Sequence, residues 1–142
     1  MSKPKKTIIE AYLKMWPRDA LNLRDGKHKL SKKDVWDLFD GSGVYVLYRD
    51  DKPYYIGRAK KICDRIHAHA NRPGDKYYNF WNFFSAFLVR DKNDISEIEG
   101  ILIAAFPTEN AAVPRLKELR LSAKVARLIH ARRLISISGD EA

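Results

Sequence analysis

Two tyrosines, an arginine, a histidine and a glutamate in the middle of the chain have side chains of types that could act on a phosphate ester. Tyr45 and Tyr55 lie in two runs of β-type residues, 43–49 and 54–57, and the turn-forming residues 50–53 would join these runs into a hairpin. An arginine offers phosphate a two-pronged donor, and a histidine changes protonation near neutral pH. A carboxylate binds hard cations. These residue types suit phosphodiester hydrolysis, which builds negative charge on phosphate oxygens.

The basic residues of this set follow the hairpin in a predicted helix over 59–70, which ends before Pro73-Gly74. At 100° per residue its apolar arc includes Cys63, which is therefore expected to be a packing residue rather than a nucleophile. The adjacent arc carries four cations and a histidine, namely Arg58, Lys61, Arg65, His69 and Arg72. This pattern by itself favours a solvated basic face. The alternative is a stripe that faces phosphate.

The glutamate lies in a second predicted helix over 94–106, which Asp94 and Glu97 would open as a capping box and Pro107 would end. Glu99 falls at the edge of its apolar arc. A carboxylate there is costly unless it meets a cation or a metal ion. Two explanations stay open. Glu99 could pair with an arginine or reach out to solvent, or it could bind Mg²⁺ together with substrate phosphate and water.

Taken in order, these motifs resemble the signature of the GIY-YIG nuclease family. Gly43-Val44-Tyr45 and Tyr55-Ile56-Gly57, separated by nine residues, resemble its two tripeptides, with Val44 in place of isoleucine. Further similar elements follow at matching spacing: Arg58-Ala59-Lys60, Arg65, His69, and Glu99 with Leu102, Ile103, Pro107 and Asn110. The resemblance covers about residues 41–112, half of the chain. A single tripeptide would be weak evidence, whereas five ordered elements are strong.

The resemblance implies a metal-dependent DNA endonuclease. Tyr45 would accept a proton from the attacking water, Tyr55 would orient the water or the phosphate, and His69 would support Tyr45 or the phosphate. Arg58, Arg65 and the metal ion are expected to lower the pKa of Tyr45, since they favour the phenolate. Both tyrosines must face one site, which requires an odd loop or a bulge in the hairpin.

The remaining implied roles concern phosphate and metal. Arg65 would clamp the scissile phosphate, and Glu99 would hold one Mg²⁺ or Mn²⁺ ion that shields the developing charge. Asn110 would hold the site together by hydrogen bonds. Contacts to the phosphate backbone are assigned to seven cations, namely Arg58, Lys61, Arg72, Lys117, Arg120, Lys124 and Arg127.

The elements that must position these residues predict an α+β fold, with a small three-stranded antiparallel or mixed sheet flanked by helices. Residues 1–40 are interpreted as a helical basic extension, because the apolar residues of 8–16 have helical spacing and Pro17 follows. Residues 41–112 form the nuclease-like core, with a third strand over 85–90. Residues 113–142 form a basic helix, opened by Pro114, that packs on or beside this core.

The charge of the 142-residue chain indicates that its two flanking segments bind nucleic acid. Its net +9 divides into +7 over 1–33, −2 over 34–112 and +4 over 113–142. The single cysteine excludes an internal disulfide and a multi-cysteine zinc site. The longest uncharged stretch, 77–89, has thirteen residues, fewer than the roughly 20 of a membrane span. We expect an intracellular, cytoplasmic protein without a membrane partner.

Three function classes remain. The first is a metal-dependent endonuclease that acts on duplex or branched DNA. The second is a nucleic-acid-binding module of the same fold that does not cut. The third is a small basic RNA-associated structural protein, in which Glu99 would have no obvious use. The intact residue set favours the first class, while the structure of the DNA and the oligomeric state stay open.

Overall fold

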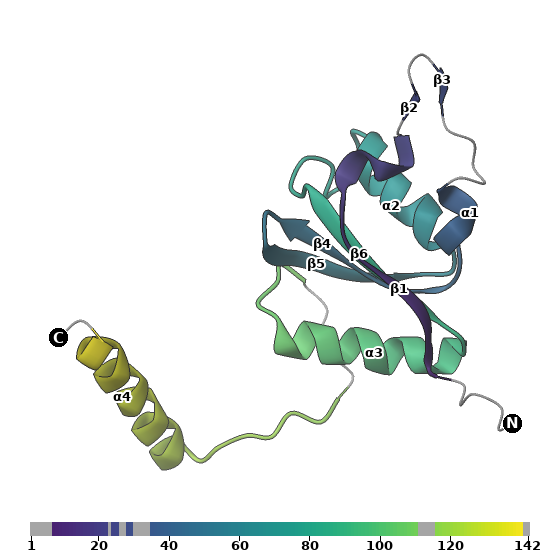
Figure 1. Ribbon diagram of the computed structural model, residues 1–142. Coiled ribbons are helices and arrows are strands. Elements are labelled where there is room, and N and C mark those ends of the chain that lie inside the picture. Colours follow the sequence, from purple (N-terminus) through teal and green to yellow (C-terminus); the bar gives the residue numbers. More distant parts are fainter. Residues whose placement is uncertain (1–6, 23, 26–27, 30–34, 111–115, 141–142) are drawn as a thin grey trace, which may run out of the picture.

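In the computed structural model the chain forms a four-stranded antiparallel sheet with helices on both faces (Figure 1). The structure describes residues 7–22, 24–25, 28–29, 35–110 and 116–140, with side chains in 7–22, 35–110 and 116–131. The fold is α+β, as predicted, but the sheet has four strands rather than three. In spatial order these are β1 (Ile9–Pro17), β6 (Phe83–Val89), β4 (Gly43–Arg49) and β5 (Lys52–Ala59).

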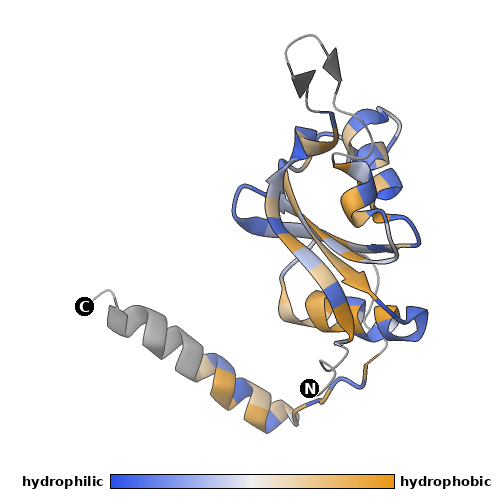
Figure 2. Cartoon of the chain, turned by 45° about the vertical axis from the view of Figure 1, so that its right-hand side comes forward, coloured by the Kyte–Doolittle hydropathy of each residue, from blue (hydrophilic) through white to orange (hydrophobic). Residues whose placement is uncertain are grey.

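Helices cover the two faces of this sheet separately. Two of them, α1 (Trp36–Phe39) and α2 (Ile62–Asn71), lie on one face, and α3 (Lys92–Ala105) lies on the other (Figure 1). Apolar residues run along the strands and along the side of α2 turned toward the sheet (Figure 2). After β1 the chain continues through a 3-10 helix, η1 (Arg18–Asn22), and a short antiparallel pair, β2 (Arg24–Asp25) with β3 (His28–Lys29).

The middle strand β4 supplies buried side chains to both layers. Tyr45 and Leu47 join the core beneath α1 and α2, and Val44 and Val46 join the core above α3. Because helices cover both faces, β4 reads as a nearly continuous apolar run instead of an alternating one. Tyr45 is thus carried by one of the most deeply buried segments of the chain.

The helix expected over 8–16 is wrong, because this segment forms the edge strand β1. Register irregularities between Ile9 and Ala11, and between Leu13 and Trp16, each add a residue to the strand. Ile9 and Tyr12 therefore pair with residues of the α3 layer, while Leu13 and Trp16 lie in the α2 layer. Each same-face pair is three residues apart, so two bulges in a strand imitate the spacing of a helix.

A bulge in the β4–β5 hairpin brings the two tyrosines of the signature to the same face. Tyr45 pairs with Gly57 and Leu47 pairs with Tyr55, but Tyr48 pairs with Pro53, so Tyr54 is an extra residue. The turn itself has only two residues, Asp50-Asp51. The prediction of an odd loop or a bulge is confirmed by the bulge. With a two-residue turn and no bulge, Tyr45 and Tyr55 would lie on opposite faces of the sheet, and the extra residue places them on the same face.

The C-terminal helix starts later than predicted. It is α4 (Ala123–Asp140), and the Ser122 hydroxyl accepts a hydrogen bond from the Val125 amide at 3.3 Å, which caps its first turn. Lys117 and Arg120 precede it, so they are not part of the helix that was predicted over 113–142. Pro114, the predicted first turn, lies outside the described residues.

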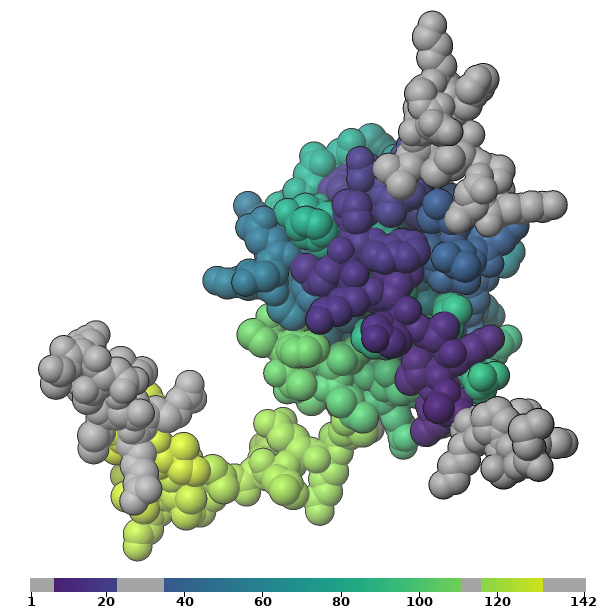
Figure 3. Space-filling view, viewed as in Figure 1, coloured from purple at the N-terminus to yellow at the C-terminus, as the bar shows by residue number. Residues whose placement is uncertain are grey.

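The described part of α4 does not pack on the core. Its helix stands apart from the sheet in Figures 1 and 3, and its apolar side chains Val125, Leu128 and Ile129 are exposed. For the described residues of α4, the prediction that this helix packs on or beside the core is therefore wrong. Neither α4 nor any other helix described is both long and apolar enough to cross a membrane.

Candidate active site

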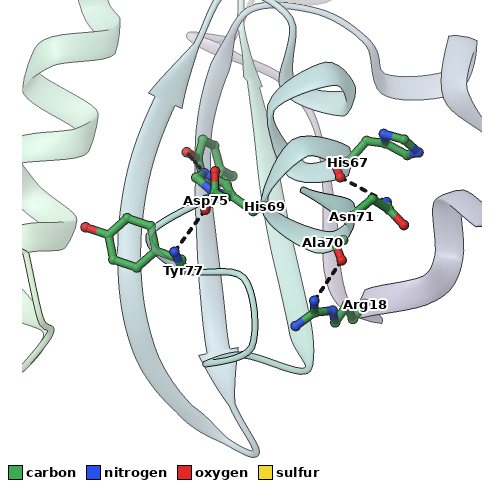
Figure 4. Close-up of polar contacts among 8 residues, drawn as sticks. Arg18, His67, His69, Ala70, Asn71, Asp75 and Tyr77 are labelled. Atoms are coloured by element: carbon green, nitrogen blue, oxygen red, sulfur yellow. Dashed lines mark hydrogen bonds and ion pairs between the residues drawn. The ribbon is translucent and has the colours of Figure 1, made fainter. Parts of the chain in front are cut away.

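Tyr45, His69 and Asp75 form a connected hydrogen-bonded row. The Tyr45 hydroxyl lies 2.8 Å from His69 Nε2, and His69 Nδ1 lies 2.8 Å from Asp75 Oδ1. The same carboxylate oxygen accepts the Tyr77 backbone N–H at 2.9 Å (Figure 4). With Nδ1 protonated toward Asp75, Nε2 is free to accept the phenolic proton of Tyr45.

Gly57 makes room for the Tyr45 ring. The two residues are directly opposite each other in the β4–β5 ladder. A Cβ atom on Gly57 would lie 2.4 Å from both Cζ and the hydroxyl oxygen of Tyr45. The ring therefore lies across β5 at a position where only glycine leaves space, which holds its hydroxyl toward α2.

The electrostatics of Tyr45 differ from the prediction. Burial raises its pKa far above 10, the nearby Tyr55 phenol adds to the rise, and Arg65 opposes it only in part. The lowering expected from the two arginines is therefore wrong, because Arg65 offsets the effect of burial only in part and Arg58 does not contribute. Desolvation prevails because the side chain is almost completely buried while Arg65 is exposed. Tyr45 is a neutral phenol that needs an acceptor for its proton.

His69 is suited to be that acceptor. Burial lowers the pKa of its imidazole below 6.5, against the opposing effect of Asp75, so the ring is neutral at neutral pH. Burial alone would raise the pKa of Asp75, but hydrogen bonds from His69 and the Tyr77 amide lower it below its usual range. The row therefore consists of a carboxylate, a neutral imidazole and a neutral phenol.

Tyr55 stands beside this row. Its ring centroid is 6.2 Å from that of Tyr45, and it stacks on Tyr77 at 4.1 Å. Burial raises the pKa of Tyr55, and the Tyr77 phenol and the Glu99 carboxylate add to this, so Glu99 is near enough to act on it. Tyr55 is half-buried, so its hydroxyl group also stays neutral.

Arg65 joins the site from α2, one helical turn before His69. Burial alone would lower the pKa of its guanidinium, but the Tyr45 and Tyr55 phenols raise it. The side chain remains exposed. A cation is thus held beside two phenols with its outer side open to solvent, as an anionic ligand would require.

Glu99 meets Arg58 at this edge of the sheet. Arg58 Nε lies 3.9 Å from Glu99 Oε1, and the Glu99 side chain is 19% exposed. Arg58 belongs to β5 and not to α2, so the predicted helical stripe from Arg58 to Arg72 is wrong. Only Arg65 and His69 of that stripe are helical, since Lys61 and Arg72 cap the two ends of α2.

The donor set at Glu99 fits a hard cation held by few protein ligands. No group of three or more His, Cys, Asp or Glu side chains gathers in the part of the chain that the structure describes. A Mg²⁺ ion is often held by one carboxylate together with substrate phosphate and water, and Glu99 is a partly exposed carboxylate of this kind. Arg58 is a group that such an ion would displace from it.

Asn110 acts on the backbone of β5. Its Oδ1 accepts the Ile56 N–H at 2.9 Å and its Nδ2 donates to the Ile56 carbonyl at 2.6 Å. Glu109 N also donates to the Tyr54 carbonyl at 2.9 Å. The segment after α3 thus covers the free edge of β5 on either side of Tyr55, and Asn110 holds the β5 backbone by hydrogen bonds.

The structure brings four of the predicted residues together on the α2 face of the sheet, namely Tyr45, Tyr55, Arg65 and His69. Glu99, on α3, is near enough to Tyr55 to act on its pKa, and Arg58 contacts Glu99. Lys117, Arg120, Lys124 and Arg127 are not among them. Cys63 is buried, and burial raises the pKa of its thiol, in keeping with its predicted packing role. Sequence reasoning missed Asp75 and Tyr77, although their position just after Pro73-Gly74 is a turn signal that could have placed them against α2.

Comparison with known proteins adds no family to this geometry: no protein-family model, curated protein or solved structure matches the chain.

Proposed function

We propose that this chain is a divalent-metal-dependent DNA endonuclease of the GIY-YIG type, which hydrolyses phosphodiester bonds. The observation that carries the proposal is the 2.8 Å contact of Tyr45 with His69 beside Tyr55 and Arg65. Residues from β4, β5 and α2 come together there, and their types suit water activation next to phosphate. A structural role alone would not require a buried phenol, a neutral imidazole and an unshielded guanidinium in one place.

In this proposal Tyr45 and His69 move the proton of the attacking water. The Tyr45 oxygen accepts a proton from water while its own proton passes to His69 Nε2. Tyr45 ends as a phenol again, and the imidazolium formed is stabilised by Asp75, 2.8 Å from Nδ1. This transfer avoids a free phenolate, which the raised pKa of Tyr45 disfavours. His69 thereby supplies the basicity that the phenol lacks.

Arg65 and Tyr55 act on the phosphate. The exposed guanidinium of Arg65 offers two parallel N–H groups to the non-bridging oxygens, which carry more charge in the transition state than in the substrate. Tyr55, stacked on Tyr77, presents a hydroxyl from a fixed ring and orients either the water or a phosphate oxygen. Asn110 holds Tyr55 in place through its two hydrogen bonds to the backbone of the next residue, Ile56.

Glu99 is the residue that would hold Mg²⁺ or Mn²⁺. Bound there, the ion would shield the charge on the phosphate and supply water to protonate the leaving 3′ oxygen. Arg58, released from Glu99, would remain beside the DNA backbone as a further cation.

The deciding experiment is nicking of supercoiled plasmid with Mg²⁺ and with EDTA. We expect cleavage by the wild type with Mg²⁺ only, and no detectable cleavage by Glu99→Ala, which should fold and bind DNA. Glu97→Ala is the matched control, because Glu97 is an exposed carboxylate on the same helix. Full activity of Glu99→Ala would contradict the metal assignment.

One observation favours the alternative, a nucleic-acid-binding module of this fold that does not cut. Tyr45 is only 1% exposed, so little of its phenol meets solvent. The same assay separates the two functions through Tyr45→Phe, which keeps the ring and removes only the hydroxyl. A loss of about 100-fold or more in nicking rate supports the enzyme. DNA binding without nicking by the wild type, with Mg²⁺ or Mn²⁺, supports the module.

A further inference from the structure

A row of aromatic rings leads from the candidate active site to the protein surface. Tyr55 stacks on Tyr77 at 4.1 Å, the ring of Tyr54 meets Tyr77 edge-on at 6.3 Å, and Phe80 lies parallel to Tyr54 at 6.0 Å with 15° between their planes. Phe80, the outermost ring, is 48% exposed. The row thus joins the residues of the proposed chemistry to an aromatic face open to solvent.

Both elements that carry these rings are fixed in place. Tyr54 is the extra residue of the β5 bulge, and its carbonyl accepts the Glu109 N–H. The loop that carries Tyr77 and Phe80 is tied to α2 by Asp75, which bonds both His69 and the Tyr77 amide. Aromatic rings on a rigid support lose little conformational entropy when a ligand stacks on them.

Arg18 fastens the far end of the same loop. Its guanidinium donates to the Ala70 carbonyl at 2.7 Å (Figure 4) and to the Trp81 carbonyl at 3.2 Å, and it lies 5.1 Å from the ring centroids of both Tyr78 and Trp81. The loop is thereby held at both ends, by Asp75 and by Arg18. Phe80 is therefore exposed on a constrained segment and not on a free loop tip.

The charge around this row suits a nucleic acid strand. Lys76 Nζ lies 5.5 Å from the Tyr77 ring centroid, and Arg72 opens the loop. The only acid between residues 72 and 80 is Asp75, which is already engaged by His69. The Asp75 carboxylate accepts hydrogen bonds from His69 and the Tyr77 amide. Aromatic faces beside cations are the combination that stacks bases and tracks a phosphate backbone.

We propose that Tyr54, Tyr77 and Phe80 form a stacking surface for unpaired nucleobases next to the scissile phosphate, so that the substrate is single-stranded or branched DNA with splayed bases. This inference rests on the proposed function for its ligand class. In continuous duplex the faces of the bases are stacked on one another and are not offered to a protein ring. A strand end, flap or junction offers such faces.

The test is binding of a labelled single strand, a splayed-end duplex and a continuous duplex, measured by fluorescence anisotropy in EDTA. Phe80→Leu keeps an apolar side chain and removes the aromatic face, and Phe80→Trp retains a face. We expect Phe80→Leu to weaken single-strand and splayed-end binding roughly 5- to 100-fold and duplex binding less than about two-fold. Phe80→Trp should bind as the wild type does. Leu38→Ala, at an exposed apolar residue of α1, is the matched control and should change none of them.

Unchanged single-strand affinity of Phe80→Leu, or an equal loss for all three DNAs, would overturn the stacking surface and would point to a protein-docking or purely electrostatic face. Because binding is measured in EDTA, the outcome is independent of cleavage. A protein that passes this test and fails to nick DNA with metal retains the stacking surface and loses the proposed endonuclease function. A protein that nicks DNA and fails this test retains the proposed endonuclease function and loses the stacking surface.

Discussion

At the scale of single residues, the site provides a proton acceptor for a buried tyrosine. The Tyr45 phenol gives up its proton less readily than a free tyrosine because burial disfavours the phenolate. Its hydrogen bond to His69 supplies an acceptor, and Asp75 fixes which nitrogen of the ring can accept. The chemistry of Tyr45 is therefore decided by two residues that follow it by 24 and 30 positions.

This arrangement predicts a pH profile. His69 accepts a proton only when it is neutral, and its pKa lies below the usual 6.5. Nicking should therefore persist below pH 6.5 and disappear as the pH falls through that lowered pKa. Asp75→Asn removes the carboxylate that raises the pKa of His69 and allows the wrong tautomer. We expect a fall in the nicking rate of about 10- to 100-fold and a shift of the acid limb to still lower pH.

The control for this prediction is Asp91→Asn, which removes the same charge at the N-cap of α3, where asparagine caps a helix equally well. It should change neither the rate nor the profile. A merely structural role for Asp75 would lower the rate of the mutant without moving its acid limb. That result, from nicking rates measured between about pH 4.5 and 8, would remove Asp75 from the proposed proton path.

At the scale of elements, two local features of one hairpin assemble the site. The bulge at Tyr54 puts Tyr45 and Tyr55 on the same face of the sheet. Gly57 then provides the space that the Tyr45 ring occupies. The helix α2 packs on this face and brings Arg65 and His69 to the two phenols, since residues four apart lie on one side of a helix.

Gly57→Ala tests the importance of that space. The added Cβ would lie 2.4 Å from the Cζ and the hydroxyl oxygen of Tyr45, so the side chain must move, and we expect its contact with His69 to lengthen. We expect a loss of about 1–3 kcal/mol in the free energy of unfolding and at least a ten-fold lower nicking rate. Thermal or urea unfolding and the plasmid assay measure the two effects.

Gly74→Ala is the matched control for this change, because a Cβ at Gly74 meets no atom within 4 Å. Its stability and activity should equal those of the wild type. If Gly57→Ala behaves like Gly74→Ala, the position of the Tyr45 ring does not depend on Gly57.

At the scale of the whole molecule, charge and chemistry are separated. The proposed catalytic residues lie in the segment 34–112, whose net charge is −2, and the excess positive charge lies before and after it. The described part of α4 and the segment before it extend away from the sheet with their side chains exposed (Figure 3). These basic residues would bind DNA phosphates without reading sequence.

Neutralising Lys117, Arg120, Lys124 and Arg127 together to glutamine should weaken DNA binding and reduce its salt dependence. The slope of log K against log salt should fall by up to about 4, roughly one for each DNA phosphate that the protein no longer neutralises. The nicking rate at saturating DNA and the melting temperature should not change, because these side chains do not contact the core. Anisotropy titrations between about 50 and 200 mM salt check the slope. A lowered melting temperature would show that this segment packs on the core after all.

Much of the fold could be predicted where the local pattern is unambiguous. The strand from Gly43 and the helices containing Arg65 and Glu99 were expected nearly where they occur, because their apolar residues repeat at the period of each element. Prediction failed at β1, where two bulges replaced the period of a strand by that of a helix. It also failed at the start of α4, where Pro114 was a more conspicuous signal than Ser122.

By itself the sequence determined the identity and order of the chemical groups: two tyrosines, an arginine, a histidine and a glutamate at spacings set by a hairpin and two helices. Its resemblance to the GIY-YIG signature also led us to expect that both tyrosines face one site. The tertiary structure alone decided that Asp75 holds His69, that burial outweighs the cations at Tyr45, and that Arg58 pairs with Glu99. The reason is physical: pKa values and partners depend on distance and desolvation, which arise only when residues distant in sequence pack together.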